Sequence, residues 1–99
     1  MSAIPSELLE QLCALVRELR TGSADFLEHH EDGQHWYNRG YANGMLRALR
    51  DLLGEDCPCG EALDDEAELQ PHRVMAWGKA YGHGEAMGER ETHEITGNT

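Results

Sequence analysis

Apolar residues recur at helical spacing in the first part of the chain. Between positions 6 and 20 they stand three and four residues apart, at Leu8, Leu9, Leu12, Leu15, Val16 and Leu19. This spacing is typical of a helix with a wide apolar face. Ser6 follows Pro5 and can cap the start of the helix, and Gly22 can end it. We therefore expect a helix over about 6–20.

A second stripe of apolar and small residues begins at Phe26. It continues in steps of four and three through His30, Gly33, Tyr37, Gly40 and Gly44. An unbroken stripe predicts one long helix over about 24–53. Glycine inside a helix costs about 1 kcal/mol relative to alanine, and Glu31-Asp32-Gly33 also has the composition of a turn. A kink or break near Gly33 is therefore the alternative.

An acidic segment, 55–70, separates this helix from the next one. It carries seven carboxylates and no basic side chain. Cys57-Pro58-Cys59-Gly60 cannot continue a helix, while Asp64 could cap a short helix that ends at Leu69. Pro71 suits the first turn of a third main helix over about 71–91.

Strand-like alternation is absent from the sequence, so the expected fold class is all-α. We expect a small bundle of three main helices, over about 6–20, 24–53 and 71–91, with an acidic loop and a short helix at 55–70. Residues 1–91 would form a single domain, and residues 92–99 a flexible tail.

The second and third main helices share a pattern of glycine and aromatic residues. At an offset of 40 positions, Tyr41 aligns with Tyr81 and Gly44 with Gly84. Because glycine weakens an isolated helix, its repetition at helical spacing predicts the close approach of another helix. These helices could form an antiparallel pair, or each could pack on its counterpart in a homodimer. We expect a homodimer, and the expected packing or dimer interface comprises Tyr37, Gly40, Tyr41, Gly44, Trp77, Tyr81 and Gly84.

Charge limits the class of partner. The 99 residues include 19 acidic and 8 basic side chains, a formal net charge of −11. This is the wrong sign for binding phosphates directly, so we expect neither nucleic acid nor an anionic membrane as a ligand. A basic protein surface, such as that of a complex that handles nucleic acid, fits the charge.

The expected location is the cytoplasm. No apolar run approaches the roughly 20 residues that span a bilayer, and the first residues lack the basic start and apolar core of a signal peptide. Three cysteines, an odd number, do not make a disulfide framework, so reduced thiols are expected.

Histidines and cysteines raise the alternative of a metal site. The candidates with the closest spacing are His30, Glu31, His35, Cys57 and Cys59. Structural zinc sites usually have two to four residues between paired cysteines, whereas Cys57 and Cys59 have one between them. We therefore expect no bound metal or cofactor. A small metal-binding protein or metal-dependent enzyme with His, Cys and carboxylate ligands is the alternative function.

The sequence contains no nucleophile elbow, phosphate-binding loop, dinucleotide fingerprint or zinc-protease motif. The expected function is therefore that of a non-enzymatic, acidic protein-binding module, an inhibitor or adaptor. In size, acidity and lack of catalytic motifs the chain looks like accessory proteins of phages and mobile elements, among them anti-restriction and anti-CRISPR inhibitors; the likeness is one of type and transfers no residues. The expected partner contacts are Glu55, Asp56, Glu61, Asp64, Asp65, Glu66 and Glu68.

Overall fold

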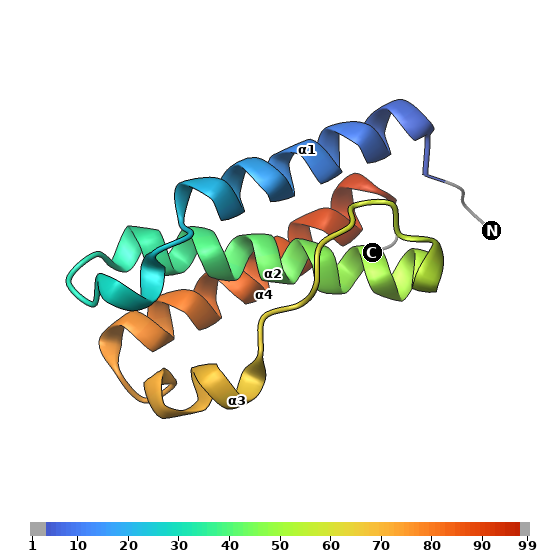
Figure 1. The fold of residues 1–99 in the computed structure, drawn as a ribbon. Coiled ribbons are helices and arrows are strands. Elements are labelled where there is room, and N and C mark those ends of the chain that lie inside the picture. The colour runs from blue at the N-terminus through green and yellow to red at the C-terminus, as the bar shows by residue number, and fades with distance from the viewer. Residues whose placement is uncertain (1–3, 98–99) are drawn as a thin grey trace.

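Four α-helices make up the framework of the computed structural model, which describes residues 4–97 (Figure 1). They are α1 (Ser6–Gly22), α2 (Gly33–Leu53), the short α3 (Glu66–Leu69) and α4 (Ala76–Ile95). Three 3₁₀ turns accompany them: η1 (Phe26–Glu28), η2 (Gly54–Asp56) and η3 (Gln70–His72). No strand occurs in residues 4–97, which confirms the all-α fold class. Over the same residues, no helix combines the length and apolar character that crossing a membrane requires.

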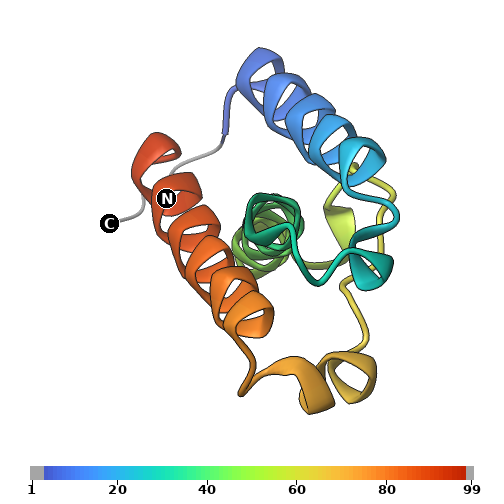
Figure 2. The ribbon, with the colours of Figure 1, turned by 90° about the vertical axis from the view of Figure 1, so that its left-hand side faces the viewer.

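The first helix forms where the apolar spacing predicted it. Its apolar face packs on α2, which runs in the opposite direction (Figure 1). The buried residues at this contact are Leu12, Cys13 and Val16 from α1 and Met45, Leu46 and Leu49 from α2. Viewed nearly along its axis, α2 is the central helix, with α1 and α4 on different sides of it (Figure 2).

The expected continuous helix over 24–53 is wrong, and the alternative break near Gly33 is what the structure contains. The Asp32 carboxylate accepts a hydrogen bond from the backbone N–H of His35 at 3.1 Å and so caps a new helix start. The indole N–H of the buried Trp36 donates to the carbonyl of His29 at 3.1 Å, which holds the preceding loop in place. Local polar contacts thus outweigh the continuous stripe.

The third main helix begins and ends later than expected. Pro71 lies in η3, and Met75, with ψ 159°, is extended, so α4 starts at Ala76. Its end lies at Ile95, beyond the expected 91, because the buried Thr92 continues to pack. The expected flexible tail over 92–99 therefore overlaps the last turn of α4. Residues 98 and 99 lie outside the described residues.

The glycine seam joins α2 to α4 within the chain. A Cβ on Gly40 would lie 2.0 Å from the carbonyl oxygen of Tyr81, and one on Gly84 would lie 2.1 Å from that of Tyr37. Only a hydrogen fits in such a space, so the glycine Cα–H faces a carbonyl oxygen across the interface. The close packing that the glycines predicted is confirmed.

The two helices are parallel, so the expected antiparallel arrangement is wrong. Gly40 contacts Tyr81, and Gly44, four residues later, contacts Glu85, also four residues later. Parallel packing is possible because residues 54–75 carry the chain back along the bundle before α4 begins (Figure 1).

Candidate protein-binding surface

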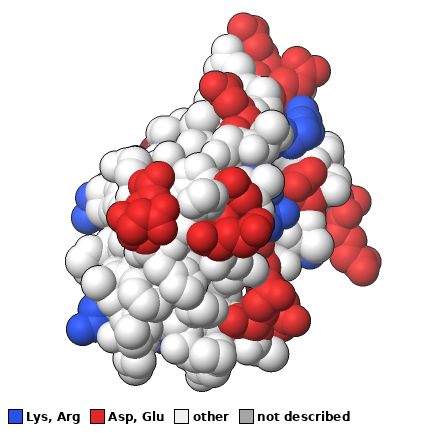
Figure 3. Space-filling view, turned by 60° about the vertical axis from the view of Figure 1, so that its left-hand side comes forward, with Lys and Arg blue, Asp and Glu red and all other residues white. Residues whose placement is uncertain are grey.

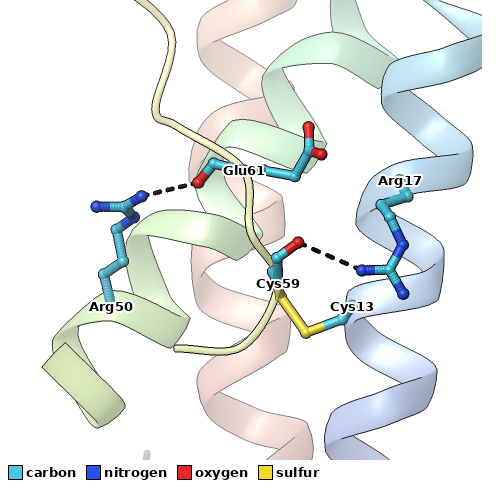
Figure 4. The surroundings of a disulfide bond; sticks show 5 residues. All are labelled: Cys13, Arg17, Arg50, Cys59 and Glu61. Atoms are coloured by element: carbon cyan, nitrogen blue, oxygen red, sulfur yellow. Dashed lines mark hydrogen bonds between the residues drawn. A yellow bond between two sulfur atoms is a disulfide. The ribbon is translucent and has the colours of Figure 1, made fainter. Parts of the chain in front are cut away.

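The acidic segment is fastened to α1 and α2. A disulfide joins Cys13 of α1 to Cys59, 46 positions later. Beside it, Arg17 donates to the carbonyl of Cys59 at 3.3 Å and Arg50 donates to that of Glu61 at 2.7 Å (Figure 4). The expectation of reduced thiols is therefore wrong for this pair. Cys57 is free and half-buried.

Asp64 lies at the centre of a buried polar network. Its side chain is 8% exposed, and its carboxylate accepts hydrogen bonds from Arg20 at 2.9 Å, Arg39 at 2.7 Å and the Tyr81 hydroxyl at 2.6 Å. Burial by itself would raise the pKa of this carboxyl group, but the hydrogen bonds from Arg39 and Tyr81 outweigh burial and lower the pKa below its usual value. Asp64 is therefore ionised and fully engaged within the chain.

Asn43 connects Asp64 to a second buried carboxylate, Glu85. Its side-chain oxygen accepts from the backbone N–H of Asp64 at 2.8 Å, and its Nδ2 donates to Glu85 at 3.0 Å. Glu85 also pairs with Arg47 at 3.3 Å and with Arg73 at 3.4 Å. The network thus joins α1, α2, α4 and the acidic segment.

Three more of the expected partner contacts have roles inside the chain. Glu61 pairs with Arg20 at 3.1 Å, and the Asp65 carboxylate accepts from the backbone N–H of Ala67 at 3.0 Å, which caps α3. Glu66 pairs with Arg73 at 2.7 Å, and the hydrogen bond from Arg73 lowers the pKa of Glu66.

The other three expected contacts are free. Glu55, Asp56 and Glu68 are exposed, and within residues 4–97 their side chains form no hydrogen bond or ion pair. Glu55 and Asp56 form η2 at the end of α2, whereas Glu68 lies in α3, farther along the bundle (Figure 1). The seven carboxylates therefore do not make one continuous contact surface.

Four exposed carboxylates gather at one end of the bundle. The N-terminal end of α1 lies beside the C-terminal end of α2 (Figure 1), and Leu8 and Leu9 pack on the same apolar cluster as Cys57. We call Glu7 and Glu10 of α1, together with Glu55 and Asp56 of η2, the acidic end. None of these four side chains has a hydrogen bond or ion pair among the described residues.

Four arginines form ion pairs with carboxylates of the same chain, so their charges are compensated. They are Arg20, Arg39, Arg47 and Arg73, and they pair with the four carboxylates Glu61, Asp64, Glu66 and Glu85. When these are set aside from the 8 basic and 19 acidic residues, 4 basic and 15 acidic side chains remain. Figure 3 shows acidic groups in separate patches on a largely uncharged face, with smaller basic patches at its sides.

The metal candidates taken from the sequence are not brought together. Cys59 is bonded to Cys13, and Cys57 packs against the α1–α2 cluster. His30, in the loop before α2, is exposed and stacks on Trp77 with 4.3 Å between ring centroids. None of these residues, nor Glu31 or His35, belongs to a group of three ligand atoms close enough to share an ion in residues 4–97.

In and after the loop that precedes α2, histidine rings contact carboxylates. His29 contacts Glu31 at 3.1 Å and Asp25 at 3.0 Å, and His35 contacts Asp25 at 2.8 Å. The hydrogen bonds from His29 to Glu31 and Asp25 raise the pKa of the exposed His29. This end of the bundle therefore carries a partly compensated charge.

The seam residues serve the interior of the chain. Tyr81 is 1% exposed, Trp77 packs on the apolar cluster of Phe26, Trp36 and Leu69, and the half-buried Tyr41 donates its hydroxyl to Glu91. Gly40 and Gly44 face the backbone of α4, and Gly84 faces the carbonyl of Tyr37 in α2. The buried Gly40, Gly44, Tyr81 and Gly84 are therefore occupied within the chain, while Tyr37, Tyr41 and Trp77 are only half-buried. A homodimer stays a prediction.

Sequence reasoning missed Arg20, Arg39, Asn43, Arg73 and Glu85 as partners of the acidic segment. Their contacts with one another and with Asp64 span 12 to 44 positions, so no local pattern reveals them. One signal was present. Asn43 is a polar residue in a stretch of α2 that is otherwise apolar or small, and a buried amide needs hydrogen-bond partners.

Comparison of the chain with protein-family models, curated proteins and solved structures found no match in any of the three.

Proposed function

We propose that this chain is a non-enzymatic protein-binding module, an inhibitor or adaptor, that engages a basic surface of a partner protein through its acidic end. The observation that supports this function is the division of charge. Four arginines pair with carboxylates, among them the largely buried Asp64 and Glu85, while other carboxylates stay exposed and unpaired within the described residues. The unpaired carboxylates include Glu7, Glu10, Glu55 and Asp56.

Long-range attraction is the physical basis of the proposal. A surface of one sign raises the rate at which a partner of opposite sign is encountered and disfavours partners of the same sign. Arg50, the basic residue closest in sequence to Glu55 and Asp56, donates to the carbonyl of Glu61, and none of the four carboxylates forms an ion pair within the described residues. Proteins that hold DNA or RNA carry basic surfaces of the required kind. An inhibitor that occupies such a surface, as an anti-defence protein of a phage or mobile element would, is the form of the module we favour.

Affinity capture tests this function. The chain is immobilised with its disulfide intact and exposed to a lysate of the source cells, and bound proteins are identified by mass spectrometry. A parallel column carries the variant Glu55→Gln/Asp56→Asn, and a control column carries Glu18→Gln/Glu28→Gln. The control removes the same charge from two exposed carboxylates that have no partner within residues 4–97.

The proposal predicts a basic protein that the parent and control columns retain and the Glu55/Asp56 variant loses. Retention of the same proteins on all three columns would contradict the role of Glu55 and Asp56. Equal loss from both variant columns would show that total charge, and not the acidic end, governs binding.

A further inference from the structure

Three metal-ligating side chains from α2 and α4 converge outside the surface described above. Asp51 comes from the last turns of α2, and Glu89 and His93 come from α4. One ligand atom of each lies within 4.8 Å of those of the other two.

The glycine seam explains why these residues meet. Gly44 brings α2 so close to α4 that a Cβ at Gly44 would lie 2.8 Å from the backbone nitrogen of Glu89. Asp51 follows Gly44 by seven residues, two helical turns, so it lies on the same face of α2 and faces α4. Glu89 and His93 are four residues apart and neighbour each other on one face of α4. Two packed helices therefore hold all three ligands.

None of these ligand groups is satisfied by the protein. Within residues 4–97, Asp51, Glu89 and His93 have no side-chain hydrogen bond or ion pair with one another or with any other residue. The Nδ1 atom of His93 is buried and lacks a hydrogen-bond partner. A buried polar nitrogen without a partner is unfavourable, and so is the close approach of two unpaired carboxylates. A cation at this point would offset the repulsion between the two carboxylates and give the His93 imidazole a partner.

We propose that Asp51, Glu89 and His93 bind a divalent transition-metal ion. One imidazole and two carboxylates supply the nitrogen and oxygen ligands that zinc accepts at about 2.0–2.2 Å, and the same set suits manganese. Three protein ligands leave at least one coordination position for water or for a group from a partner. The site uses none of the four residues of the acidic end, so it does not rest on the proposed function.

A titration with zinc, monitored by isothermal calorimetry, tests the site. The probe is Zn²⁺ alone, added to the full chain with its disulfide intact. The variants are Asp51→Asn, Glu89→Gln and His93→Gln. The control is His83→Gln, which removes an exposed histidine of the same helix. We expect one zinc ion per chain and a loss of at least about tenfold in affinity in each of the three variants, with no change in the control. Because Asp51 is exposed, its variant tests the site even if His93→Gln fails to fold.

Manganese locates the site independently. Backbone NMR signals near a bound Mn²⁺ broaden, and we expect the broadening to centre on residues 51, 89 and 93. Broadening centred on His29 and His35, a zinc affinity that falls in Cys57→Ser, or equal zinc affinity in the parent, Asp51→Asn and His93→Gln would overturn the proposal. The absence of zinc binding at millimolar concentration would overturn it as well.

Discussion

Gly44 of α2 and Glu85 of α4 lie backbone against backbone, since a Cβ on Gly44 would stand 2.0 Å from the carbonyl oxygen of Glu85. The side chain of the same Glu85 accepts a hydrogen bond from Asn43, the residue before Gly44. Asn43 in turn accepts from the backbone of Asp64. The turn of α4 around Glu85 therefore serves two contacts. Its backbone packs closely on α2, and its side chain helps to hold the acidic segment through Asn43.

Replacing Gly44 with alanine should destabilise the protein by at least about 1–3 kcal/mol, because the added Cβ meets backbone that cannot move aside. Thermal and denaturant unfolding measure the change. The matched control is Gly82→Ala in α4, where the nearest atom would be Arg73 Nη1 at 3.8 Å. There the higher helix propensity of alanine should stabilise by about 0.5–1 kcal/mol. Equal effects at the two glycines would show that close packing does not explain the seam.

Asp64→Asn should cost about 3 kcal/mol, because it leaves the largely buried Arg39 without a negative partner and Arg20 with Glu61 alone. The pKa of Asp64 is lowered by folding, so the stability due to its ionised form is present above the ordinary carboxyl range and is lost as pH falls through the lowered pKa. Urea unfolding of the parent and the variant at pH 7, 4 and 2 measures this. The difference between the two proteins should shrink at the lowest pH. A difference that stays constant would contradict the ionised role.

The disulfide between Cys13 and Cys59 should contribute about 4 kcal/mol to stability, because it closes a loop whose ends are 46 positions apart. Unfolding of Cys13→Ser/Cys59→Ser measures this, with Cys57→Ser as the control. Thiol titration of the unreduced, denatured protein should find one free thiol per chain, that of Cys57. Three free thiols in freshly isolated protein would restore the expectation of reduced cysteines.

His29 should titrate above the ordinary histidine pKa, because Glu31 and Asp25 both stabilise its charged form. The linked stability is present at low pH and is lost as pH rises through the raised pKa. NMR titration of the histidine ring signals measures the pKa directly. Glu31→Gln should lower it. An unchanged pKa in Glu31→Gln would show that the contact at 3.1 Å is not kept in solution.

Local signals predicted most of the helices and few of the long-range contacts. The apolar spacing of α1 and the glycine repeat indicated real elements, because both patterns follow from the geometry of a single helix. The predicted direction of α4 relative to α2 was wrong, because that direction depends on the path of residues 54–75, which no periodicity in the sequence reports. The predicted role of Asp64 as a partner contact was also wrong, because Asp64 pairs with Arg20 and Arg39 inside the chain. A run of carboxylates looks the same whether its counter-charges are solvent ions or the distant Arg20 and Arg39.

The disulfide between Cys13 and Cys59 also bears on the compartment in which the protein resides. Disulfides persist mainly in oxidising surroundings, so the bond between Cys13 and Cys59 weighs against the cytoplasm expected from the sequence. The thiol titration, carried out on protein trapped by alkylation in the source cells, decides between the two locations. One free thiol would favour an oxidising compartment, and three would favour the cytoplasm.

The most direct test of the account is the association rate of the chain with its captured partner at several salt concentrations. We predict that Glu55→Gln/Asp56→Asn lowers this rate and flattens its dependence on salt, because the acidic end supplies the attraction. The control Glu18→Gln/Glu28→Gln, with the same net charge, should stay close to the parent. Equal rates and equal salt dependence in the two double variants would contradict the assignment of binding to the acidic end.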